Sequence, residues 1–206
     1  MAKSYFDDAR VTGNAPAPPV TAQTIDDFED NDLAEYQGST GPYTTQSTTV
    51  HDGTYAAQLV NQGVTGGTPH AFSTSGLANY PEAGDTIQGY VRFSGSGSGN
   101  IAGYTFGVQD ETTGYWAYLD EDEGIKLATL DFNTVNVTTV SVTDGIWYRM
   151  VVEWGAAGSI THTVYDDTDT EVGSVSMTDS SYTSGGFGLH AQQNSQDTWF
   201  DTFEII

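Results

Sequence analysis

The chain has 206 residues and carries 28 acidic side chains against five lysines and arginines, so its formal net charge is −23. This charge argues against nucleic acid and anionic membrane surfaces as partners, because both attract lysine and arginine. It does not indicate a disordered acidic tail, because such tails have few aromatic residues and this chain has 9 Phe, 12 Tyr and 4 Trp. Charges this dense repel one another unless salt screens them, so we expect a high-salt environment.

The sequence lacks cysteine, a recognisable secretion signal and a long apolar run. There is no cysteine, which rules out disulfides and thiolate metal sites. There is also no basic stretch followed by an apolar core near residue 1, and no run of about 18 apolar residues. We therefore expect no secretion signal and no membrane insertion.

The first segment, residues 1–24, differs from the rest of the chain in charge. Its two basic and two acidic residues cancel, so residues 25–206 hold the whole excess of acid. The Ala-Pro-Ala-Pro-Pro run at 15–19 predicts an extended, Pro-rich arm. We hypothesise that the arm is neutral because it docks against another subunit, the alternative being a disordered terminus. Its anchors would be Phe6, Val11 and Val20.

From residue 25 onward, short runs of alternating apolar and polar residues are separated by Gly, Asn, Asp, Ser and Thr. This pattern is typical of an all-β sandwich or barrel, and no helical periodicity is sustained. We predict one domain over 25–206. Its strands are expected at 25–29, 54–60, 85–93, 101–109, 113–119, 124–130, 147–154, 159–165, 171–177, 185–191 and 198–206.

Turn residues connect three of these strands into a meander. Thr113-Gly114 is predicted to close the first hairpin, and the acidic run at 120–124 is predicted to form a solvated turn into the next strand. The alternating Ser and Gly residues at 94–99 have no large side chain to pack and predict a mobile tip.

Period-two alternation assigns the faces of two strands. Tyr104, Phe106 and Val108 share one face of the strand at 101–109. In the strand at 147–154, Arg149 and Glu153 lie opposite an apolar row, and we expect them to pair.

The order of these pieces resembles the concanavalin A-like lectin and glucanase jelly rolls, which include laminin G-like and family-16 glucanase domains. IDDFEDNDLAEYQG looks like the first strand of those domains, and VHDGTYAAQL resembles the second. The closing series is the best match, namely WYRMVVEW, THTVYDD, SGGFGLHAQ and TWFDTFEII. The resemblance covers residues 25–206 and implies an antiparallel two-sheet jelly-roll sandwich.

The resemblance also implies a calcium ion on the convex side of the domain. In family-16 relatives the ligands are the acid before the first-strand Phe, a carbonyl near the second-strand Gly and an Asp in the last strand. Those positions are Asp27, Gly53 and Asp201 here, with Asp52 and Glu29 as possible additions. Calcium takes six to eight oxygen ligands, which this set and water can supply. The alternative is that these are further solvated acids.

Catalytic groups are not evident. Family-16 glucanases carry Glu-x-Asp-x-Glu on one cleft strand, whereas the runs IAGYTFGVQ and GYWAYL hold no acid. The four histidines, His51, His70, His162 and His190, are scattered and are expected to be packing or surface residues. We therefore expect no enzymatic activity.

A sugar-binding role fits the sequence better. Tyr115, Trp116 and Tyr118 follow a strand with one polar face and could offer stacking platforms for a glycan. The alternative is that these aromatic residues belong to the core, as most aromatics in sandwiches do.

Two interpretations of function remain. In the first, the chain is a structural protein of a halophilic virus particle, a turret, decoration or tail-fibre subunit. It would dock through its arm to other virion subunits, form a homo-oligomer and display a sandwich that binds host glycans. In the second, it is a stand-alone carbohydrate-binding module of a halophilic cell-surface or glycan-degrading system, extracellular or at the cell surface.

Overall fold

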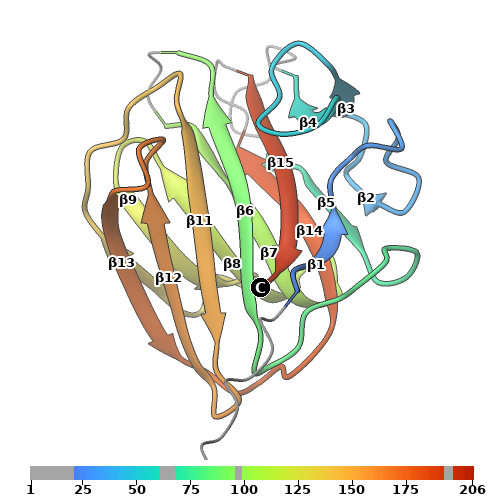
Figure 1. The fold of residues 1–206 in the computed structure, drawn as a ribbon. Coiled ribbons are helices and arrows are strands. Elements are labelled where there is room, and N and C mark those ends of the chain that lie inside the picture. The colour runs from blue at the N-terminus through green and yellow to red at the C-terminus, as the bar shows by residue number, and fades with distance from the viewer. Residues whose placement is uncertain (1–20, 61–67, 96–98, 193–196) are drawn as a thin grey trace, which may run out of the picture.

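The structure, a computed structural model, describes residues 21–60, 68–95, 99–192 and 197–206 and consists of two antiparallel sheets packed face to face (Figure 1). Phe6, Val11 and Val20, the expected anchors of the arm, lie outside the described residues. The docking of residues 1–24 therefore stays a prediction.

The first sheet has eight strands and includes the C-terminal strand of the chain. Its order is β13-β12-β11-β6-β15-β4-β3, and β1 also pairs with β15. The strands are β13 (Glu171–Thr178), β12 (Ser159–Tyr165), β11 (Trp147–Trp154), β6 (Thr86–Phe93), β15 (Thr198–Ile205), β4 (Ala56–Leu59), β3 (Tyr43–Gln46) and β1 (Gln23–Asp26).

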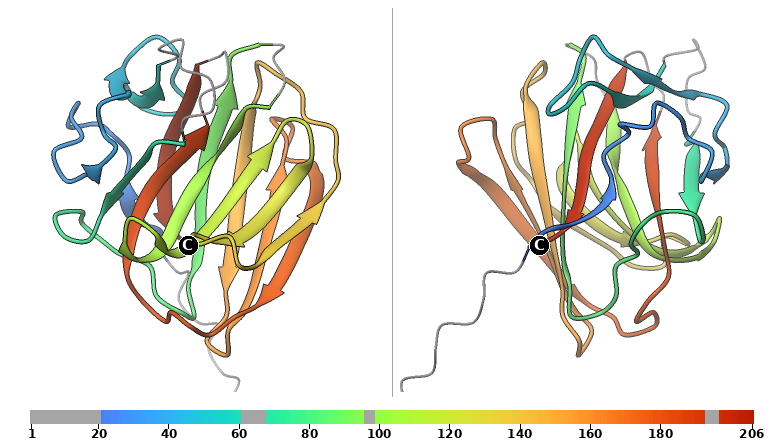
Figure 2. Two further views of the ribbon diagram at one scale, coloured as in Figure 1. Left: turned by 180° about the vertical axis from the view of Figure 1, so that it is seen from behind. Right: turned by 45° about the vertical axis from the view of Figure 1, so that its right-hand side comes forward.

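The second sheet has seven strands and lies behind the first (Figure 2). Its order is β10-β9-β8-β7-β14-β5-β2. The strands are β10 (Val135–Thr138), β9 (Gly124–Thr129), β8 (Thr113–Asp120), β7 (Ile101–Asp110), β14 (Gly186–Gln192), β5 (His70–Ser73) and β2 (Gln37–Gly38). The expected all-β, two-sheet architecture is confirmed.

Aromatic side chains from both sheets fill the space between them. Tyr104 packs edge-on against Phe203 at 5.5 Å between ring centroids, and Phe106 packs in the same way against Trp154 at 5.1 Å. In β6, alternate residues are buried against this core, as a half-exposed strand requires. The strands β8 and β9, by contrast, are buried on both faces, so side chains also cover the outer face of the seven-stranded sheet.

Several local expectations were wrong. The hairpin between β7 and β8 turns at residues 111–112, because Asp110 pairs with Thr113, so the expected Thr113-Gly114 turn is part of a strand. Val108 leaves the face of Tyr104 and Phe106, because a bulge follows Phe106 and Gly107 adopts a φ of +61°. Only glycine adopts this conformation at little cost.

Two electrostatic expectations also differ. Arg149 does not pair with Glu153, because its guanidinium packs over the ring of Tyr165, on the neighbouring strand, and binds Asp169 in the loop beyond it. The acidic run at 120–124 is only partly solvated, because Asp120 is 5% exposed. Of the expected tip at 94–99, residues 96–98 lie outside the described part of the chain.

One edge strand of each sheet, β13 of the first and β10 of the second, lies against the other. Asn136 Nδ2 donates a hydrogen bond to the Ser176 carbonyl at 2.7 Å, and Thr138 Oγ1 donates one to the Ser174 carbonyl at 2.7 Å. Side chains of one edge strand thus bind backbone acceptors of the other.

Candidate functional site

The outer face of the seven-stranded sheet carries a continuous stack of rings. Gly103 on β7 pairs with Tyr118 on β8 and with His190 on β14, and it has no side chain to fill the space between their rings. The indole of Trp116 stacks on both rings. The centroid separations are 3.8 Å to Tyr118 and 3.9 Å to His190. His70 extends the stack, 4.8 Å from His190. Two histidines 120 positions apart in the sequence therefore become neighbours, which no local spacing could indicate.

The structure separates the three residues expected to form a sugar platform. Tyr115 faces the core between the sheets, and its hydroxyl donates a hydrogen bond to Asp179 at 2.8 Å. Trp116 and Tyr118 lie on the outer face, but they are only 1% and 3% exposed. Sugar stacking at Trp116 stays a prediction, and it would require the side chains that cover the indole to move.

A buried ion pair lies beside this ring stack. Lys126 Nζ donates a hydrogen bond to Asp120 Oδ2 at 2.7 Å and also binds Glu123. The other oxygen of Asp120 accepts the backbone N–H groups of Asp122 and Glu123. Asp120 therefore fixes the turn between β8 and β9 and neutralises the lysine on the sheet.

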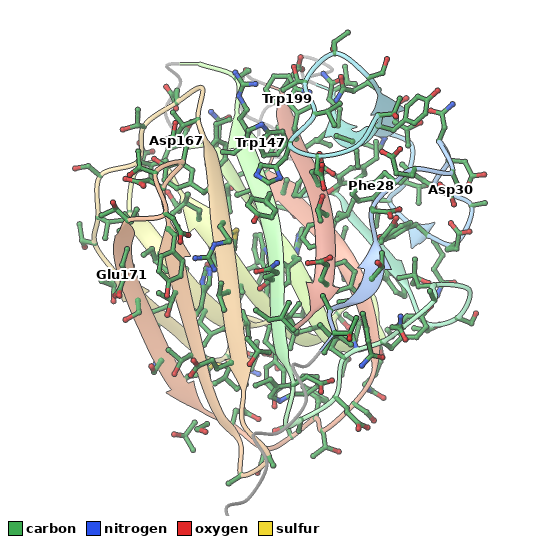
Figure 3. All side chains as sticks on the ribbon, viewed as in Figure 1. Phe28, Asp30, Trp147, Asp167, Glu171 and Trp199 are labelled. Carbon is green, nitrogen blue, oxygen red and sulfur yellow. The ribbon has the colours of Figure 1, made fainter. Side chains whose placement is uncertain are left out.

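The outer face of the eight-stranded sheet has an open hollow of about 350 Å³. Tyr90 on β6 and Trp147 on β11 form its floor, and His51 reaches it from the loop after β3. Figure 3 shows Trp147 on this face, with Asp167 on the neighbouring loop. The hollow is lined by His51, Tyr90, Trp147, Arg149, Asp166, Asp167 and Asp169.

The aromatic rings of the hollow are held in a fixed arrangement. His51 stacks on Tyr90 at 3.6 Å and meets Trp147 edge-on at 5.6 Å. Burial raises the pKa of Tyr90 and lowers the pKa of His51, so both side chains are neutral near pH 7. Tyr90 and Trp147 are partly exposed, and His51 is exposed.

Charged groups surround these rings. Arg149 Nε donates a hydrogen bond to Asp169 at 3.0 Å, and the guanidinium lies 4.1 Å from the Tyr165 ring. Asp166 accepts the backbone N–H groups of Thr168 and Thr170, and hydrogen bonds from Thr168 and Thr170 hold the pKa of Asp166 below its usual range. The hollow thus combines aromatic faces with ionised acceptors and a guanidinium donor, a composition suited to a hydroxyl-rich ligand.

Sequence reasoning missed this site for a topological reason. Trp147 and Arg149 share the outward face of β11, and that signal is visible in the alternation. The contribution of His51, and that of the loop at 166–169, depends on how distant segments return to the same face.

The residues expected to bind calcium are brought together in part. Asp27, Glu29, Asp52 and Gly53 line a smaller hollow of about 120 Å³. Asp201 lies beside it, fully buried, and its Oδ2 accepts the backbone N–H of His51 at 2.6 Å and that of Asp52 at 3.2 Å. Burial raises the pKa of Asp201 to about 6.

The chemistry of this hollow fits a hard cation. Its described lining includes four carboxylates and no lysine or arginine, and oxygen ligands of this kind suit calcium. Asp201 contacts backbone N–H groups, so it would hold the loop that carries Asp52 and would not itself bind the cation. A separate acidic group, formed by Asp30, Asp32 and Glu35, lies in the loop after β1.

No protein-family model and no curated protein sequence matches the chain. Solved structures do match. The carbohydrate-binding module CBM66 from Bacillus subtilis is 16% identical with a TM-score of 0.52, over 80% of this chain and 96% of that one. An endo-β-1,4-glucuronan lyase from the fungus Trichoderma reesei is 14% identical with a TM-score of 0.54, over 87% and 92%.

A third similar structure is the exoplasmic/lumenal domain of VIP36 in a form bound to Ca²⁺ and Man3GlcNAc. It is 12% identical with a TM-score of 0.51, over 82% of this chain and 84% of that one. The chain has the concanavalin A-like β-sandwich fold. The fold is shared by carbohydrate-binding modules, lectins and glycan lyases, and none of these three proteins is described as a virion component.

Within the described ranges, no helix has the length and apolar character that a membrane crossing requires.

Proposed function

We propose that the protein is a non-catalytic carbohydrate-binding module that holds a glycan in the hollow formed by His51, Tyr90 and Trp147. The observation that carries the proposal is this partly exposed aromatic floor with charged hydrogen-bonding groups around its rim. A sugar ring would pack its apolar face on Trp147. Its hydroxyl groups would donate to Asp166 and accept from Arg149.

The charges of the hollow favour a neutral glycan. Its lining holds one arginine against three aspartates, and Asp169 already binds that arginine. An acidic sugar would therefore meet an excess of like charge, which costs binding energy. Such a module would work where polysaccharide is available, outside the cell or at its surface.

The absence of catalysis is part of the proposal. A glycoside hydrolase needs a carboxylic acid whose pKa is raised so that it can protonate the leaving group. The surroundings of Asp166 act in the opposite direction, because its hydrogen bonds favour the ionised form. The virion interpretation depends on residues 1–24, and the three similar structures described above favour the carbohydrate-binding interpretation instead.

The calcium site is also a proposal. Asp27, Glu29 and Asp52 would supply carboxylate oxygens and Gly53 its carbonyl. A cation there would neutralise the acids that join β1 to the loop before β4. Glu29 already contributes to that junction, because its Oε1 accepts the backbone N–H groups of Thr54 and Tyr55.

The proposed function is tested by screening the full chain against a glycan array in molar salt and measuring the affinity of any ligand for three variants. We expect Trp147→Ala to weaken binding by at least about 30-fold, as loss of a central aromatic contact does. Thr163→Ala, on the same sheet but outside the hollow, is the matched control and should bind as the wild type does. If binding is lost in a folded Trp116→Ala variant but kept in Trp147→Ala, the glycan site is on the other sheet.

A further inference from the structure

Three chain segments meet at one rim of the sandwich through Asn100, Glu121 and Asp144. Asn100 immediately precedes β7, Glu121 lies in the turn between β8 and β9, and Asp144 lies in the segment before β11. The Glu121 N–H donates a hydrogen bond to the Asn100 carbonyl at 3.0 Å. In return, Asn100 donates to Glu121 Oε2 twice, from its backbone N at 3.2 Å and from its Nδ2 at 2.6 Å.

Two acceptors in this group lack a hydrogen-bond donor. Asn100 is 0% exposed and its Oδ1 has no partner, although its Nδ2 is bonded to Glu121. Glu121 Oε1 is also buried and has no donor from a neighbouring group. A buried polar atom without a partner costs free energy, so native structures satisfy nearly all of them with protein groups, water or ions.

Glu121 has a second carboxyl group, that of Asp144, as a neighbour. Asp144 lies within reach of the Glu121 carboxyl group and favours its protonated form, because two neighbouring carboxylates repel each other and have only acceptors. Burial and then this contact raise the pKa of Glu121 to about 8. The groups that act most on the pKa of Glu121 include no lysine or arginine. Elsewhere in the described part of the chain, Lys126 and Arg149 bind other acids, and Arg92 lies over Trp199.

We propose that Asn100, Glu121 and Asp144 form a second cation site, which takes a divalent ion of the calcium type. The ion would replace the proton on Glu121, and Asn100 Oδ1, Glu121 Oε1 and the Asp144 carboxylate would become its ligands. Two carboxylates neutralise a double charge. Both acids are partly exposed, so water can complete the six to eight oxygen ligands that calcium takes.

This site is independent of the hollow at Asp27 and of the proposed glycan site. Its three ligands join the start of β7, the β8–β9 turn and the segment before β11. Asn100 and Glu121 are already joined by hydrogen bonds, so bound calcium would add the segment before β11 to this junction and stabilise the folded state in proportion to its occupancy.

The test uses the full chain with Asp27→Asn as the background, so that calcium binding at the other proposed site is removed. Thermal unfolding is followed in chelator and in CaCl₂ at about 100 times the measured Kd. We expect calcium to raise the melting temperature by about 5–10 °C. Glu121→Gln should melt as the background does in chelator, because a glutamine amide can donate to Asp144, and should lose the rise with calcium.

Asp122→Asn is the matched control, because it removes an exposed charge from the same turn. It should keep the whole calcium-dependent rise. An equal rise in Glu121→Gln and Asp122→Asn would overturn the proposal, as would the absence of any rise in the background protein. If Glu121→Gln fails to fold, Asp144→Asn gives the same comparison from the other side of the pair. A rise equal to that of the control would again overturn the proposal.

Discussion

Replacing His162 by glutamine is expected to make the stability of the protein less sensitive to acid. His162 lies on β12, is 0% exposed and points into the core between the sheets. Its Nδ1 donates a hydrogen bond to the Lys126 carbonyl on β9, in the opposite sheet, at 3.0 Å. Its Nε2 is buried without a partner, so a second proton would place an unpaired charge in the core.

The size of the effect follows from the shift in pKa. Burial lowers the pKa of His162 from 6.5 to about 4. Because the folded state binds the proton more weakly, the contribution of neutral His162 is fully present above pH 6.5 and is lost as the pH falls towards 4. This lowering of the pKa corresponds to about 3 kcal/mol of the free energy of unfolding, of which about 2 kcal/mol is lost between pH 7 and pH 5.

The assay is denaturant unfolding of the wild type and His162→Gln at pH 7 and pH 5, at constant salt. His190 and the acidic residues titrate in both proteins, so their contributions cancel in the difference. We expect the free energy of unfolding to fall by about 2 kcal/mol more in the wild type than in the variant. An equal fall in the two proteins would show that His162 is protonated without cost, and would refute the reasoning.

Two further predictions concern charges. Lys126→Met should lower the free energy of unfolding at pH 7 by about 3–5 kcal/mol, because it leaves the Asp120 carboxylate buried without its cation. Adding Asp120→Asn to this variant should recover part of the loss, as measured by denaturant unfolding. The absence of any recovery would contradict the pairing. Asp27→Asn should leave the melting temperature in chelator unchanged, because Asp27 is exposed, and should reduce the rise that calcium produces in the wild type. A calcium response that Asp27→Asn does not change would exclude that hollow as a binding site.

The long strands could be predicted from the sequence, whereas four of the short ones could not. The strands β11 and β12 have the expected bounds, because residues alternate along a half-exposed face over seven or eight positions. The strands β2, β3, β5 and β10 were missed, and each has only two to four residues. In β5 all four residues are buried, because the ring stack covers the outer face, so there is no alternation to detect.

The candidate site was less accessible to sequence reasoning. The stacking of His51 on Tyr90 joins a loop residue to a strand 39 positions later, and Arg149 finds Asp169 only because β12 returns beside β11. The family resemblance placed the expected calcium ligands in part. Asp27 and Gly53 line one hollow, whereas Asp201 is turned towards backbone N–H groups. Backbone contacts of this kind are invisible in a pattern of residue types.

The hydrogen bonds from Asn136 and Thr138 to β13 bear on how the protein behaves at high concentration. An unpaired edge strand is a template on which another chain can add a strand, which leads to aggregation. Salt that screens the net charge of −23 also removes the repulsion that keeps molecules apart. Because side chains of β10 already occupy the carbonyls of Ser174 and Ser176, an incoming strand would have to displace them before it could pair. These hydrogen bonds thus protect the β13 edge against strand addition, and salt does not screen them as it screens the net charge.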